Sequence, residues 1–347
     1  MQTITFRRPD DLHVHFRDGD MLRAVVPFTA RAFGRAIVMP NLTPPVTTAA
    51  MAAAYRGRIL AAVPDGVDFT PLMTCYLTDS TDPADLVAGH RDGIFAAAKL
   101  YPAHATTNSS HGVTSVERIE AVLGAMEENG IPLLAHGELT GSEIDIFDRE
   151  KGFVEEVMIP TLAKFPRLRM VLEHITTDDG AKAAVSFGSR VAATITPQHL
   201  IYNRNALFQG GLRPHMYCLP ILKREKHRLA LRAAATSGLP NYFLGTDTAP
   251  HMKHLKECDC GCAGVFSAPV AVEAYLRVFE EEGALDGFEA FASLNGAAFY
   301  GLEPARETVT YAREERRVEK SIDAGSDGSL VPLFAGETVR WTRREAA

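Results

Sequence analysis

The sequence predicts an α/β fold: a single (β/α)8 barrel of the TIM type, with its active site at the carboxyl ends of the strands. Short apolar runs alternate with stretches that have apolar residues at helical spacing, which implies parallel strands joined by helical crossovers. Eight such runs fit into 347 residues, and a single barrel of this kind can reach that length. No Gly-x-Gly-x-x-Gly turn follows the first run, which argues against a doubly wound nucleotide-binding sheet.

The predicted elements follow one another along the whole chain. The strands are expected over residues 11–17, 35–41, 68–77, 94–102, 131–138, 169–175, 191–200 and 242–250. Between them, segments such as 116–129 and 153–164 are typical of amphipathic helices. In a charged C-terminal segment, 304–347, we expect a solvated helix over 312–320 and a short strand over 336–342, packed on the barrel. No low-complexity linker interrupts the sequence, so residues 1–347 are predicted to form one domain.

The composition excludes several classes of function. Hydrophobic residues make up 46% and charged residues 23%, which is typical of a globular protein. A formal net charge of −7 and the lack of a basic stripe argue against nucleic-acid binding. No apolar run could span a bilayer, and the first residues lack the features of a signal peptide. An odd number of cysteines, five, indicates reduced thiols and predicts a cytoplasmic protein without membrane contact.

Metal-binding residue types recur at the ends of the predicted strands, where barrel enzymes carry out their chemistry. Two histidines spaced two apart on one strand project from the same face, and imidazole suits zinc. The strand-end residues are His13, His15, Asn41, Lys99, His136, His174 and Asp247. Each has an ordinary alternative, such as a satisfied polar histidine, a solvated lysine or a loop-capping aspartate. Four histidines, a lysine and an aspartate at one mouth are far less easily explained in that way, so we predict a metal site.

Lys99 is an unusual member of a metal site, because an ammonium group repels a cation. Burial can lower the pKa of a lysine until a neutral amine is present. A neutral amine can add CO2 and form a carbamate, whose two oxygens could bridge divalent ions roughly 3.5–4 Å apart. The alternative is a charged Lys99 that binds a substrate carboxylate, and the sequence leaves both interpretations open.

Ten motifs carry a resemblance to a known family. They are 11–17 (Asp-Leu-His-Val-His-Phe-Arg), 39–45, 98–102, 105–112, 134–138, 172–177, 195–199, 217–220, 244–251 and 260–264. The sequence resembles the amidohydrolase superfamily, and within it the compact bacterial dihydroorotase family. Larger relatives carry a β-sandwich domain before the His-x-His strand. Only twelve residues precede His13, so the resemblance implies that this domain is absent.

The resemblance implies two Zn2+ ions per subunit, bridged by carboxylated Lys99 and a hydroxide. The more buried ion would be held by His13, His15 and Asp247, and the other by His136 and His174. The resemblance also implies a homodimer.

The resemblance further implies how a small cyclic substrate binds. Arg17, Asn41 and His251 would bind a ring carboxylate, and the planar fork of an arginine matches a carboxylate. Backbone groups of Leu219, Ala263 and Gly264 would orient the ring. Thr106 and Thr107 would belong to a polar loop that closes over it.

The reaction implied is the reversible hydrolysis of L-dihydroorotate to N-carbamoyl-L-aspartate, the third step of pyrimidine biosynthesis. The bridging hydroxide would attack the ring carbonyl, and Asp247 would pass the proton to the leaving nitrogen. One alternative is another cyclic amidohydrolase, of the hydantoinase, allantoinase or dihydropyrimidinase type, whose substrates lack the ring carboxylate. A more remote alternative is a barrel subunit without catalysis.

Three further features of the sequence are expected to have no catalytic or metal-binding role. The spacing Cys258-x-Cys260-x-Cys262 has no distant second pair, so we expect a turn with free thiols rather than a zinc site. His199 is expected to be buried behind the ligands. His104 and His111, which flank the polar loop, are expected to be exposed.

Overall fold

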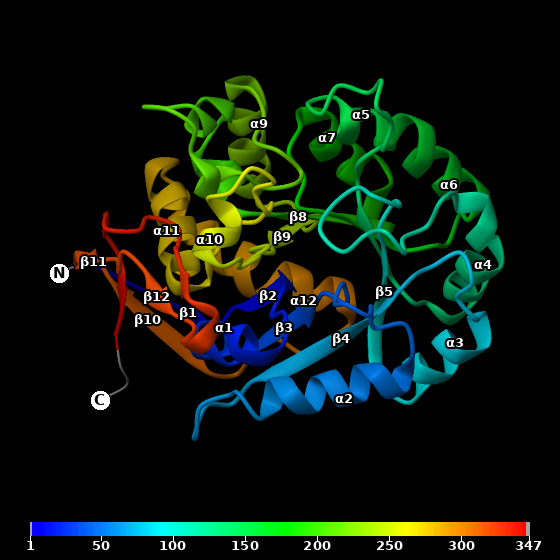
Figure 1. Cartoon of the computed structure of the whole chain (residues 1–347), viewed down its shortest axis with the longest axis horizontal. Helices are drawn as coiled ribbons and strands as arrows, with labels where there is room; N and C mark the ends of the chain where they lie inside the picture. The colour runs from blue at the N-terminus through cyan, green and yellow to red at the C-terminus, as the bar shows by residue number, and fades with distance from the viewer. Residues whose placement is uncertain (1, 345–347) are drawn as a thin grey trace.

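Eight parallel strands form a barrel in the computed structural model of the protein, which describes residues 2–344 (Figure 1). Each strand pairs with its neighbours in chain order: β2 (Asp10–Val14), β3 (Arg35–Val38), β4 (Thr70–Tyr76), β5 (Phe95–Leu100), β6 (Leu133–His136), β7 (Met170–Glu173), β8 (Val191–Ile195) and β9 (Tyr242–Leu244). A parallel bridge between Val14 and Thr248 brings the chain beyond β9 back to β2. The predicted barrel and all eight strands are confirmed, although most observed strands end before the predicted bounds.

Helices surround the strands (Figure 1). They are α1 (Gly19–Ala32), α2 (Ala49–Leu60), α3 (Pro83–Arg91), α4 (Glu120–Asn129), α5 (Arg149–Phe153), α6 (Ile159–Lys164), α7 (Asp178–Ser186), α8 (Pro197–Ile201), α9 (Glu225–Ala235), α10 (Lys253–Lys256), α11 (Ala271–Glu281) and α12 (Asn295–Tyr300). The predicted helix over 116–129 is a 3-10 turn followed by α4, and the one over 153–164 is a π-helical stretch followed by α6. No helix within residues 2–344 is long and apolar enough to cross a bilayer.

Apolar side chains fill the barrel interior. The cluster consists of Leu12, Ile37, Met39, Ala97, Leu134, Val171, Ala192, Phe243 and Phe299. Along each strand these residues precede the polar ones, so the apolar layer lies toward the amino ends and the polar residues lie at the opposite mouth. Helix α12 packs closely on this layer, because a Cβ on Gly296 would lie 1.9 Å from Leu12 Cδ1.

The two ends of the chain form a small antiparallel sheet on one flank of the barrel (Figure 1). β1 (Thr3–Arg7) pairs with β10 (Thr308–Ala312), which pairs with β15 (Thr342–Arg343). Two shorter pairs follow, β11 (Arg316–Arg317) with β14 (Thr338–Val339) and β12 (Ile322–Asp323) with β13 (Ser329–Leu330). The predicted strand over 336–342 corresponds to β14 and the start of β15. Residues 345–347 of the predicted C-terminal segment lie outside the described residues.

The predicted helix over 312–320 is wrong. Alternate residues of β10, Val309 and Tyr311, are buried, and Tyr311 stacks on Phe6 of β1 at 5.7 Å between ring centroids. The charged residues that follow do not form a solvated helix. Two of their arginines pair with acidic residues of α11 instead. Arg313 lies 2.6 Å from Glu280, and Arg316 lies 3.0 Å from Glu273.

Candidate active site

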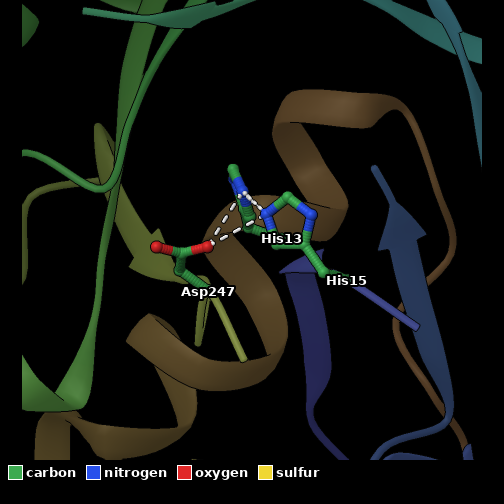
Figure 2. Close-up of side chains that lie close together, drawn as sticks. All are labelled: His13, His15 and Asp247. Atoms are coloured by element: carbon green, nitrogen blue, oxygen red, sulfur yellow. Dashed lines mark hydrogen bonds and ion pairs between the residues drawn. The ribbon is translucent and has the colours of Figure 1, made fainter. Parts of the chain in front are cut away.

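Three buried side chains at the carboxyl ends of the first and last barrel strands meet at one point (Figure 2). His13 Nε2 lies 3.3 Å from His15 Nε2, and Asp247 Oδ1 lies 3.4 Å and 3.1 Å from these two atoms. The Asp247 amide donates to the His13 carbonyl at 2.9 Å, which fixes this approach. Within residues 2–344, no other three histidine, cysteine or acidic side chains converge in this way.

The hydrogen bonds behind the two imidazoles determine which ring nitrogens carry protons. His13 Nδ1 contacts a carboxylate oxygen of Glu173, and His15 Nδ1 lies 2.8 Å from Asn41 Oδ1. Both partners are acceptors, so each Nδ1 is the donor, and the lone pair of a neutral ring then lies on Nε2. Burial lowers the pKa of His15 to about 3, which keeps this imidazole neutral. Two lone pairs and a carboxylate therefore face one another, an arrangement that a bound cation would stabilise.

A second group of polar residues lies beside the first. The His174 ring lies tilted beside those of His13 and His136, with ring centroids 4.9 Å and 4.8 Å apart. Its Nδ1 is buried without a hydrogen-bond partner, whereas His136 Nε2 lies 2.8 Å from Glu138. The ligand atoms of His136 and His174 are not part of the three-residue convergence at Asp247.

Lys99 is completely buried on β5 beneath this mouth. Its Nζ has no hydrogen-bond partner and lies 5.0 Å from the centre of the Tyr101 ring. Burial lowers the pKa of Lys99 to about 8, although the negative charges of Glu173 and Asp247 oppose this. An amine in this environment loses its proton far more readily than a surface lysine.

The Arg17 guanidinium group is half-buried, and no carboxylate within residues 2–344 pairs with it. Its Nε donates to the Pro250 carbonyl at 3.2 Å, and Nη2 lies 3.0 Å from His251 Nε2. Its Nη1 is buried and unpartnered. Burial and the charge of Arg17 lower the pKa of His251 to about 2, so His251 adds no second charge. Buried donors of this kind normally have partners, and the free Nη1 indicates a place for an anion.

Most of the predicted residues line one small cavity. The predicted residues in its wall are His15, Arg17, Asn41, Thr106, Thr107, His136, His174, Leu219, Asp247, Ala263 and Gly264. The other three lie directly against this wall: His13 contacts Asp247, Lys99 contacts Tyr101 and His251 contacts Arg17. The structure thus brings all the predicted site residues together, while their binding roles stay predictions.

Comparison with known proteins agrees with this geometry. The amidohydrolase family profile matches residues 10–306. A dihydroorotase of Erythrobacter litoralis is 60% identical over 340 residues, 98% of each chain, and one of Klebsiella pneumoniae is 60% identical over 343 residues, 99% of this chain and 98% of the relative. The chain belongs to the dihydroorotase family of amidohydrolases.

Solved structures of this family superpose on almost the whole chain. A Campylobacter jejuni dihydroorotase has a TM-score of 0.90 at 34% identity, and covers 99% of this chain and 98% of its own. A Saccharomyces cerevisiae dihydroorotase in complex with 5-fluoroorotic acid has a TM-score of 0.92 at 30% identity, with 99% coverage of both chains. An Arthrobacter aurescens L-hydantoinase shares only the fold, at 15% identity and a TM-score of 0.81, with 98% of this chain and 83% of its own covered.

Backbone strain in this dihydroorotase-family enzyme concentrates at the mouth. Arg17, His174 and Asp247 have φ values of 59°, 41° and 46°, in the left-handed region that disfavours side chains. Each such residue costs about 1–2 kcal/mol. All three lie within three residues of the end of a barrel strand, where this sharp turn aims the side chain at the cavity.

The polar loop predicted to act as a lid lies against the cavity. Asn41 Nδ2 donates to the Thr107 carbonyl and Asn108 Nδ2 donates to the Asn41 carbonyl, each at 3.0 Å. Because Asn41 Oδ1 also accepts from His15, Asn41 connects the loop to a candidate metal ligand. As predicted, His104 and His111 at the flanks are exposed.

Sequence reasoning missed the acidic residues behind the histidines. Glu173 accepts from His13, and Glu138 accepts from His136. Asp11 accepts hydrogen bonds of 2.8 Å and 2.6 Å from Thr246, which tie β2 to the segment after β9, and burial raises its pKa to about 7. A signal was present, because an acidic residue inside a buried strand needs a partner.

The cysteines and His199, for which the sequence predicts no chemistry, lie apart from the three-residue convergence. All five cysteines are free, and Cys258 and Cys260 lie exposed on a turn with their sulfur atoms 3.4 Å apart. His199 is buried outside the three-residue convergence, as predicted. Its Nδ1 lies 2.7 Å from Thr196 Oγ1 and its Nε2 donates to the Pro220 carbonyl at 3.0 Å.

Proposed function

We propose that the enzyme is a zinc-dependent dihydroorotase that interconverts L-dihydroorotate and N-carbamoyl-L-aspartate. The observation that carries this proposal is Arg17, which lines the same cavity as Asp247 and whose Nη1 is buried without a partner. A ring that carries both a cyclic amide and a carboxylate satisfies both features at once. The named activity of the relatives supports the same substrate.

The donor set fits a pair of divalent cations. His13, His15 and Asp247 would hold one Zn2+, because their three ligand atoms already face one another. His136 and His174 would hold the other. Lys99 would bridge the two as a carbamate, for which a buried, unpartnered Nζ is the required starting point. When bound, such a pair supplies a water that deprotonates near neutral pH and an electrophile for the amide carbonyl.

The protein residues supply binding and proton transfer. Arg17, with Asn41 and His251, would bind the ring carboxylate. Asp247 would accept a proton from the attacking water and deliver it to the ring nitrogen as the carbon–nitrogen bond breaks. In the reverse reaction Asp247 must start protonated, so ring closure is expected to be favoured at lower pH than ring opening.

The remaining binding groups come from loops around the cavity. Backbone groups of Leu219, Ala263 and Gly264 would orient the ring, and Thr106 and Thr107 would cover it. A homodimer and a cytoplasmic location, which the resemblance and the reduced thiols imply, belong to this proposal. So does a place in pyrimidine biosynthesis.

Turnover of two kinds of ring tests the proposal. The purified enzyme is assayed with dihydroorotate and with hydantoin and dihydrouracil, which lack the ring carboxylate. The assays are repeated after chelation and after zinc is returned. We expect turnover of dihydroorotate that disappears on chelation and returns with zinc. Faster turnover of a ring without the carboxylate, or full activity without metal, would refute the proposal.

A further inference from the structure

Lys256, the last residue of α10, is a buried cation whose hydrogen bonds go only to backbone carbonyls. It is 4% exposed. Its Nζ donates to the carbonyls of Tyr217, Cys262 and Gly264 at 3.1, 2.8 and 2.6 Å. An ammonium group has three protons, so this arrangement uses every donor.

No carboxylate of the described residues, 2–344, pairs with this ammonium group. Burying a charge that only neutral dipoles stabilise costs more desolvation free energy than burying an uncharged side chain at the same place. Burial lowers the pKa of Lys256 to about 8, and the charge of Arg17 acts in the same direction, whereas Cys218 and Cys262 oppose it. The cost indicates that the position of the three carbonyls matters beyond stability.

The three carbonyls belong to the two segments that form one wall of the cavity. Tyr217 is two residues before Leu219, and Ala263 lies between the other two contacts, Cys262 and Gly264. The Gly264 amide also donates to the Tyr217 carbonyl at 2.9 Å, which joins the two segments directly. One ammonium group thus holds the backbone on both sides of Ala263 and fixes it to the segment before Leu219.

The wall has little room to relax if this contact is lost. A Cβ on Gly264 would lie 2.3 Å from the Ala249 carbonyl, so the backbone is in tight contact there. The Ala263 carbonyl lies 3.0 Å from His251 Nε2, which itself contacts Arg17. A shift of the 262–264 segment would therefore reach the predicted ring-carboxylate site.

We propose that Lys256 is a positioning residue, which holds segments 217–219 and 262–264 so that their backbone groups meet the ring of the substrate. This proposal rests on the proposed function. Lys256 does not touch the reacting atoms, so its loss is expected to weaken binding far more than the chemical step.

The test compares Lys256→Met, Lys256→Arg and Lys253→Met. Lys253 lies on the same helix with a side chain that is 51% exposed, so its variant is the matched control. For Lys256→Met we expect KM for dihydroorotate to rise about 10- to 100-fold, because a misplacement of about 1 Å can have that effect. We expect kcat and zinc content to stay within about twofold of the wild type, Lys256→Arg to recover part of the loss, and Lys253→Met to behave as wild type.

Hydrogen exchange at the Gly264 amide gives a readout that does not depend on activity. It is expected to exchange faster in Lys256→Met than in wild type, because its acceptor Tyr217 is no longer held. A folded Lys256→Met with wild-type KM, a loss confined to kcat, or unchanged exchange would overturn the proposal.

Two further results are possible, and the other variant and the exchange measurement decide how each is interpreted. If Lys256→Met does not fold, Lys256→Arg decides: a raised KM at unchanged kcat supports the proposal, and wild-type constants or a second failure to fold overturn it. If wild type does not turn over dihydroorotate, the proposed function has failed and the substrate role fails with it. The exchange measurement then shows whether Lys256 still holds the wall.

Discussion

Replacing Arg17 with methionine is expected to remove the site's specificity for a ring carboxylate while leaving its metal ligands in place. The methionine keeps most of the apolar length of the side chain but loses the guanidinium group. Arg17 is half-buried, and its partners are the Pro250 carbonyl and the neutral His251. Its loss therefore leaves no protein carboxylate unpaired. The variant is expected to lose binding free energy for the anionic ligand instead.

The expected loss of activity follows from the ion pair that a ring carboxylate would form with Arg17, whose Nη1 is buried. Removing one partner of a buried ion pair costs about 3–5 kcal/mol. At 1.36 kcal/mol per factor of ten, kcat/KM for dihydroorotate should fall by roughly two to four orders of magnitude. Arg17→Lys keeps the charge but loses the fork, so an intermediate loss is expected.

The assay is steady-state ring opening of dihydroorotate, with zinc content measured on every variant. Arg23→Met is the control, because Arg23 is exposed on α1 and pairs with Asp20 of the same helix. Residual turnover of dihydrouracil, which lacks the carboxylate, should not fall in Arg17→Met. A kcat/KM for dihydroorotate within about threefold of the wild type would refute the reasoning, and so would an equal loss on both rings.

Three further predictions follow from the buried groups. Glu173→Gln should lower zinc affinity about 10- to 100-fold in competitive chelation, because His13 loses its charged partner; the exposed Glu155→Gln should not, and equal affinities would count against the role. Chelation should lower the melting temperature and zinc should restore it, since a ligand that binds only the folded state stabilises it; an unchanged melting temperature would argue against the ligand set. Burial lowers the pKa of His199 to about 4, whereas an unfolded histidine titrates near 6.5. As the pH falls from 6.5 to 4, the unfolded state therefore binds more protons at this residue than the folded state does. The free energy of unfolding of the wild type should fall by about 3 kcal/mol for this reason, and that of His199→Gln should not. Parallel curves for wild type and variant in denaturant titrations would exclude this role.

The barrel could be predicted because its signals are local. Each strand is a short apolar run, and parallel pairing then places all carboxyl ends at one mouth. This geometric rule predicts that His13 and Asp247, more than two hundred residues apart, lie together. The strand bounds were less accurate, because residues such as Arg17 leave the sheet in a left-handed turn that no side-chain pattern indicates.

Pairings set by distant packing could not be predicted. The charges after residue 312 resemble a solvated helix until α11 supplies Glu273 and Glu280 as their partners. The same limit applies to the supporting carboxylates. Glu173 reaches His13 across 160 residues of sequence, and only the closed barrel shows which histidine it serves.

Several buried polar atoms at the mouth have no hydrogen-bond partner, and this supports its role as a binding site. Arg17 and Lys99 each bury a donor atom without a partner, and His174 buries an unpartnered ring nitrogen. Each unmade hydrogen bond costs about 1–3 kcal/mol. The barrel keeps these groups in place because Asp11 and the Asp247 amide join the first strand to the segment after the last. Cations and an anionic ring would each relieve part of that cost, so binding and stability should rise together at this mouth.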